Sequence, residues 1–112
     1  MELPIKYNDV KKFIESNNLF EVTKKHLFEW LENSYQENAT DFENSLNANL
    51  EVVLKSYIFK DEGVSFNQSF SYDPPMNYIT VRIRIHDDND SYLNEYTAFF
   101  DLDLKIFDDV MK

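Results

Sequence analysis

Hydrophobic and polar residues alternate without a break along residues 78–86, YITVRIRIH. Ile79, Val81, Ile83 and Ile85 share one side of this segment, and the residues between them share the other. A period of two over this length predicts a half-buried β-strand, and β-branched residues favour a pleated surface. We therefore expect the segment to lie inside a sheet, with a strand on each edge and a cover over its apolar side.

The first half of the chain follows the helical period instead. Asn8 or Asp9 can cap a short helix that ends near Glu15, and the polar residues 16–18 interrupt the pattern. A second helix is predicted over residues 19–35, where apolar residues recur at steps of three and four. Both helices are expected to turn their apolar faces toward the sheet.

A third helix is predicted to begin at Thr40, because Thr40 and Glu43 have the spacing of a capping box. Its apolar positions continue to Tyr57. Residues 52–59 also favour strands, so the helix either runs on to Tyr57 or gives way to a strand midway through them. Gly63, the only glycine of the chain, is expected in the turn from this helix into the sheet, with a positive φ.

Further strands are predicted on both sides of the alternating segment. The pattern indicates a strand over residues 64–72, another over residues 92–101 and a short edge strand around residues 105–107. The proline-containing residues 73–77 and the polar residues 87–91 form the turns between them. Strands that follow one another through such short turns pair as an antiparallel meander.

Length and composition agree with one core. The chain has 112 residues, of which 43% are hydrophobic and 16% aromatic, enough to bury a large area for its size. We predict a single domain over residues 1–112 with an α+β fold. In this fold, two or three N-terminal helices pack on a three- to four-stranded antiparallel β-meander.

The net charge of −10, from 21 acids and 11 basic residues, narrows the choice of partners. Phosphate backbones repel such a surface, so we expect no nucleic-acid binding. A basic protein is attracted to it, although acidity also serves solubility alone. Cysteine is absent, no signal peptide is visible, and no apolar run approaches the ~18 residues of a membrane helix. We therefore expect a cytoplasmic protein without a membrane contact.

Catalytic signatures are missing from the sequence. A single glycine excludes the glycine-rich loops that bind phosphates. His86 stands beside acids, a pairing that supports acid–base or metal chemistry, but no serine or cysteine nucleophile motif accompanies it. The acids of residues 87–90 fit a calcium loop only in part, because Tyr92 and Ala98 stand where glycine and glutamate are required. We expect no enzymatic activity, no cofactor and no metal.

Acidic residues gather near the end of the chain. The residues after His86 include eight acids and two lysines, a net charge of −6. Aromatic residues among them, such as Phe107, can anchor an interface that charges surround. A solvated acidic face is the alternative. The contact residues predicted for this acidic region are Asp87, Asp88, Asp90, Tyr92, Glu95, Tyr96, Asp101, Asp103, Asp108 and Asp109.

The closing segment EYTAFFDLDLKIFDDVMK places an aromatic strand before an Asp-rich turn and a short terminal element. With this segment, the short, acidic, cysteine-free chain resembles the small immunity proteins that protect bacteria from polymorphic or contact-dependent toxins. The resemblance implies a non-enzymatic cytoplasmic inhibitor that binds a cognate toxin, commonly a basic nuclease, and blocks its active site. Carboxylates suit this role, because they can pair with the Lys and Arg residues that hold phosphate.

Two other functions remain open. A curved sheet covered by helices, as in cystatin-like and nuclear transport factor 2-like folds, can enclose a ligand pocket, with His86 or a buried Asp for chemistry. Such a pocket is expected to be lined by Phe66, Phe70, Ile83 and Trp30. A structural subunit that pairs through an edge strand is the other possibility. For the immunity protein, we expect a monomer or a weak dimer.

Overall fold

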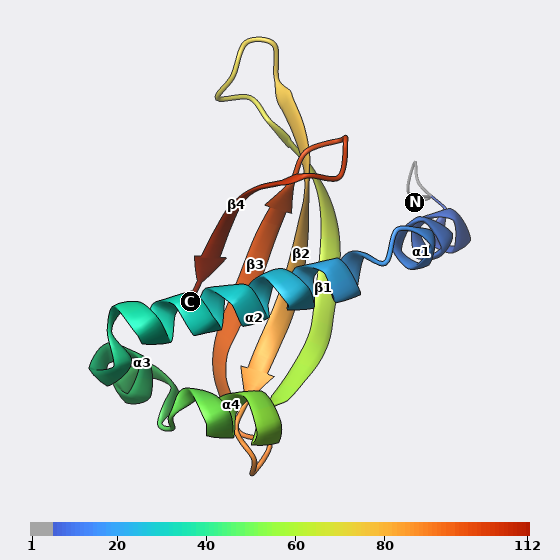
Figure 1. Cartoon of the computed structure of the whole chain (residues 1–112). Coiled ribbons are helices and arrows are strands. Elements are labelled where there is room, and N and C mark those ends of the chain that lie inside the picture. Colours follow the sequence, from blue (N-terminus) through green and yellow to red (C-terminus); the bar gives the residue numbers. More distant parts are fainter. Residues whose placement is uncertain (1–5) are drawn as a thin grey trace.

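The structure is a computed structural model that describes residues 6–112. Within these residues, four helices precede four strands (Figure 1). The helices are α1 (Tyr7–Ser16), α2 (Leu19–Glu37), α3 (Ala39–Leu46) and α4 (Leu50–Ser56). The strands are β1 (Ile58–Ser69), β2 (Met76–His86), β3 (Tyr92–Phe100) and β4 (Ile106–Met111). The predicted α+β fold, with helices packed on an antiparallel meander, is confirmed.

The alternating segment forms β2 and lies inside the sheet, as predicted. The strand order is β1-β2-β3-β4, and every pair of neighbours is antiparallel. Ile83 faces Asp61 of β1 on one side and Tyr96 of β3 on the other. Val81 and Ile83 are fully buried, which follows from their position in the middle of the covered face.

Helices α2, α3 and α4 provide the cover for this face. Leu27 and Leu31 of α2 join Phe42 of α3 and Val53 of α4 in one hydrophobic core with the apolar side of β2. Figure 1 shows α2 crossing the strands, α4 at the end of the sheet near the β2–β3 turn, and the β1–β2 loop projecting beyond the opposite end. Helices α2, α3 and α4 therefore leave that opposite end of the sheet uncovered, whereas Phe13 of α1 packs on Phe66 of β1, with ring centroids 5.8 Å apart.

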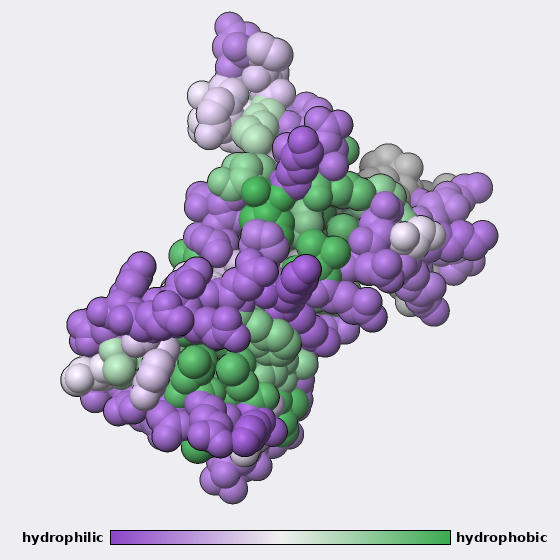
Figure 2. All heavy atoms as spheres, viewed as in Figure 1, coloured by the Kyte–Doolittle hydropathy of each residue, from purple (hydrophilic) through white to green (hydrophobic). Residues whose placement is uncertain are grey.

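Hydrophobic atoms come to the surface in two places. Figure 2 shows them between α2 and α4, and along the sheet toward the base of the projecting loop. The outer surface of α2 is hydrophilic, as expected for a helix with one buried face. Both areas depart from an ordinary polar surface.

The predicted third helix is wrong, because the chain divides it into α3 and α4. Asn47 has a φ of 60°, a left-handed conformation that ends α3. Asn49 then caps α4, since its Oδ1 accepts a hydrogen bond from the Val52 N–H at 3.0 Å. Asn38, rather than Thr40, caps α3 in the same way. The apolar period continues through the break, so periodicity alone does not reveal it.

The expected position of Gly63 is also wrong. Gly63 lies inside β1, which begins at Ile58, and the pairing with β2 shifts register between Asp61 and Gly63. Its φ is not positive. The glycine instead makes room for Arg82, because a Cβ atom there would lie 2.5 Å from the Arg82 guanidinium.

The strand ends differ from the predicted boundaries as well. β1 ends at Ser69, so Phe70 and Tyr72 belong to the β1–β2 loop (residues 70–75). β4 is longer than the predicted edge strand, because residues 106–111 pair with β3.

Substitution of Asn47 tests the break between α3 and α4. Asn47→Ala should lower the free energy of unfolding by about 1 kcal/mol, because alanine tolerates a left-handed conformation poorly. Asn47→Gly is the matched control and should be close to the wild type. Urea unfolding followed by circular dichroism measures both. An Asn47→Ala protein as stable as the wild type would contradict the left-handed helix end.

Candidate functional site

The predicted acidic region divides between the two ends of the sheet. Residues 87–91 form the β2–β3 turn, whereas residues 101–105 form the β3–β4 turn. β3 runs the length between them, roughly 30 Å at about 3.3 Å per residue. The acids at its two ends therefore do not form a single patch.

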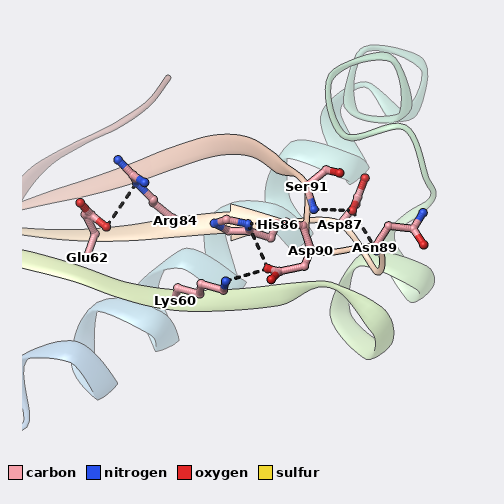
Figure 3. Close-up of polar contacts among 8 residues, drawn as sticks. All are labelled: Lys60, Glu62, Arg84, His86, Asp87, Asn89, Asp90 and Ser91. Atoms are coloured by element: carbon pink, nitrogen blue, oxygen red, sulfur yellow. Dashed lines mark hydrogen bonds and ion pairs between the residues drawn. The ribbon is translucent and has the colours of Figure 1, made fainter.

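Asp87 is built into the β2–β3 turn. Its Oδ1 atom accepts hydrogen bonds from the Asn89 and Ser91 N–H groups, both at 2.9 Å (Figure 3). Its own N–H donates to the Ser91 carbonyl at 2.9 Å. Asp87 therefore closes the turn, as Asx side chains commonly do.

The charge of Asp90 is paired with that of a lysine of the same chain. Lys60 Nζ lies 2.7 Å from Asp90 Oδ1, and His86 Nδ1 lies 3.2 Å from the same oxygen (Figure 3). The hydrogen bond from Lys60 lowers the pKa of the Asp90 carboxyl, although partial desolvation opposes it. The contact of the His86 side chain in this turn is therefore with Asp90, and it holds the turn together.

The β3–β4 turn repeats the design of the β2–β3 turn. Asp101 Oδ1 accepts from the N–H groups of Asp103 and Lys105, at 2.9 and 3.0 Å. Asp101 is therefore a turn residue, like Asp87. Glu95 has another role, since it lies 3.6 Å from Arg84 Nε, which also lies 3.2 Å from Glu62.

Tyr96 does not belong to the surface, which corrects its prediction as a partner contact. Its side chain is 0% exposed, and its hydroxyl donates to Asp109 Oδ2 at 2.7 Å. Burial raises the pKa of Tyr96, and the hydrogen bond to Asp109 adds to the effect. Tyr92 is accessible, at 52% exposure, and the Arg84 guanidinium lies 5.2 Å from its ring centre.

The remaining predicted acids are exposed. Within residues 6–112, neither a hydrogen bond nor an ion pair engages the carboxylates of Asp88 and Asp103. Asp108 is exposed as well, and its Oδ1 accepts only from the neighbouring Asp109 N–H at 2.9 Å. Asp103 and Asp108 lie at the uncovered end of the sheet, and Asp88 lies at the other end. Their binding to a partner stays a prediction.

Four aromatic residues gather beside Asp108, on the side of the sheet away from the helical core. Tyr78, Phe99 and Phe107 contact one another, with ring centroids 6.1 to 6.4 Å apart. With Tyr72 they line a cavity of about 190 Å³, which Asp108 also lines. We call Tyr72, Tyr78, Phe99 and Phe107 the aromatic surface.

The aromatic surface is accessible to a partner. Tyr72 is 59% exposed and Phe107 is 47% exposed, and Phe70, in the same loop as Tyr72, is 77% exposed. The sequence pattern offers Phe107 as an anchor but predicts Phe70 and Tyr72 within a strand. The prolines at positions 74 and 75 are the nearest sequence signal for a loop, since neither can donate to a strand ladder.

The predicted ligand pocket is not formed by the four residues expected to line it. Ile83 is buried in the core, and Phe70 lies in the projecting loop. Trp30 does line a cavity, of about 240 Å³, between α2, α3 and the strands β3 and β4. Its other lining residues are Ser34, Asp41, Phe42, Ser45, Leu46, Asn94 and Met111.

Neither a metal cluster nor a membrane helix is present in residues 6–112. No three histidine, cysteine, aspartate or glutamate residues in this range are grouped to hold a metal ion. None of its helices combines the length and the apolar character needed to span a bilayer. Comparisons with protein-family models, curated proteins and solved structures found no match for this chain. The functional assignment of the candidate site is therefore based on its geometry alone.

The ion pair of Asp90 should make stability depend on pH. Its folded-state pKa is lowered, so the contribution is present above the ordinary aspartate value of about 3.9 and is lost as the pH falls through the folded-state pKa. Asp90→Asn should therefore reduce the free energy of unfolding at neutral pH, and the difference from wild type should vanish in acid. Asp88→Asn, with the same change of charge, is the control. A constant difference for Asp90→Asn at every pH would contradict the ion pair.

Proposed function

We propose that the chain is a non-enzymatic binding protein that neutralises a basic protein partner, in the manner of the small bacterial immunity proteins. The observation that supports it is the aromatic surface, which lies at the uncovered end of the sheet beside exposed carboxylates. The partner class proposed is a nuclease-type toxin, and the proposed location is the cytoplasm of a bacterium. The inhibitor acts as a monomer or a weak dimer.

The aromatic surface has the properties of an interface centre. Binding energy concentrates in a few large side chains, with aromatic residues over-represented among them. Tyr72 and Phe107 expose much of their area, while Tyr78 and Phe99 pack against Phe107 from the sheet. Because Phe107 is packed in this way, it loses little conformational freedom when a partner covers it.

Charge supplies the second part of the argument. Asp73 follows Tyr72 in the projecting loop, Asp108 is exposed beside the other rings, and Asp103 is exposed in the β3–β4 turn. A net charge of −10 steers a basic partner toward the protein and makes its association sensitive to salt. Carboxylates at the contact can pair with the Lys and Arg residues that a nuclease uses to hold phosphate, and so block its active site.

A pull-down of the tagged protein from a lysate of its source organism, at low and high salt, tests the proposed function. Mass spectrometry should find one basic protein in stoichiometric amount, which high salt weakens. The captured protein should lose its activity when the chain is added. Absence of any basic partner at low salt would contradict the proposal.

Two substitutions locate the contact once the partner is known. Tyr72→Ala and Phe107→Ala should each weaken binding by at least about tenfold, because truncation of a central aromatic anchor costs about 2 kcal/mol or more. Tyr92→Ala is the matched control, since Tyr92 is comparably exposed at the opposite end of the sheet. Calorimetry or surface plasmon resonance measures the three dissociation constants. A larger loss for Tyr92→Ala would move the contact to the β2–β3 turn.

A further inference from the structure

A second site that could contact a basic partner lies between the helices and β4. The cavity of about 240 Å³ described above brings together Trp30 of α2, Asp41 of α3 and Asn94 of β3. Phe42 and Leu46, both buried in the core, form its apolar floor. Asp41 and Ser45 are exposed residues of its lining, so the cavity opens to solvent.

The polar lining includes two acceptors with capacity for further hydrogen bonds, Asp41 and Asn94. The side-chain oxygen of Asn94 is buried, yet it has no hydrogen-bond partner among the described residues. The Asp41 carboxylate accepts one hydrogen bond, from Asn38 Nδ2 at 2.9 Å, and retains capacity for more. The lining contains neither lysine nor arginine nor histidine. A buried acceptor without a donor is costly, so a ligand that brings N–H groups gains by entering.

We infer that this cavity receives the guanidinium group of an arginine side chain of the partner. This inference rests on the proposed function, because it assigns an anchor residue to the same basic partner. A guanidinium is planar, carries five N–H donors and stacks on aromatic rings. Trp30 offers an indole ring, while Asp41 and Asn94 offer oxygen acceptors around one space. An ammonium group fits the charge but stacks less well.

β4 connects the cavity with the aromatic surface. Phe107 and Asp108 stand at the start of this strand, and Met111, at its end, lines the cavity. β4 is also an edge of the sheet. The cavity and the aromatic surface lie on opposite faces of the sheet, so a partner that wraps around this edge reaches both.

Nuclear magnetic resonance on the full isotope-labelled chain tests the inference without the partner. The probe is Nα-acetyl-L-arginine amide, and the control is Nα-acetyl-L-norleucine amide, which lacks the guanidinium. Trp30 is the only tryptophan of the chain, so its indole N–H signal is unambiguous. The arginine derivative should shift this signal and the Asn94 side-chain amide in a saturable manner, and the norleucine derivative should not.

Paired substitutions separate a specific site from general attraction to an acidic protein. Asp41→Asn should weaken binding of the arginine derivative about fivefold, as expected for loss of a partly exposed ion pair. Glu32→Gln, an exposed position on α2 with the same change of charge, should leave the affinity unchanged. Asn94→Leu should weaken binding as well, and a melting curve verifies that this variant folds.

The outcomes distinguish the inference from the proposed function. Equal shifts with both derivatives, or equal weakening by Asp41→Asn and Glu32→Gln, would overturn the arginine site. Capture of a basic partner whose affinity Asp41→Asn does not change would also overturn it, while the proposed function would stand. Saturable binding of the arginine derivative without any protein partner would establish the guanidinium chemistry of the cavity and overturn only the proposed function.

Discussion

The apolar side of β2 holds the protein together. Ile79, Val81, Ile83 and Ile85 are each at most 2% exposed, and they meet α2, α3 and α4 in a single core. Burial of such side chains stabilises a fold by about 1.5 to 3 kcal/mol each. This contact therefore determines which face of the sheet the helices cover. Because the helices gather on one part of that face, the opposite end of the sheet extends beyond them. The aromatic surface lies on the other face of the sheet, which the core of α2, α3 and α4 does not cover.

Several acidic residues of this protein have structural roles. Asp87 and Asp101 close the two turns, Asp90 pairs with Lys60, and Asp109 accepts a hydrogen bond from buried Tyr96. A count of acids in the sequence therefore overstates the charge available to a partner near these positions. The carboxylates that stay available near the aromatic surface make the interface negatively charged. They contribute specificity and association rate rather than most of the binding free energy.

The sequence predicts the sheet better than the site, for a physical reason. Alternation in β2 and β3 is set by burial, and burial is what the fold selects, so both strands were predictable. The break at Asn47 and the bulge at Gly63 depend on single backbone conformations that periodicity does not carry. Tyr96 and Tyr92 look alike in the sequence, but register places one in the core and the other in solvent. Tyr72 and Phe107 line the same cavity although they are far apart in the sequence, so no local pattern predicts that they lie together.

Hydrogen–deuterium exchange on the complex with a captured partner tests the central claim, that the partner covers the aromatic surface. We expect slower exchange in residues 70–78 and 99–108 and unchanged exchange in residues 87–91. The free protein provides the reference for each segment. Protection confined to residues 87–91, with residues 70–78 and 99–108 unaffected, would contradict the account and return the contact to the β2–β3 turn.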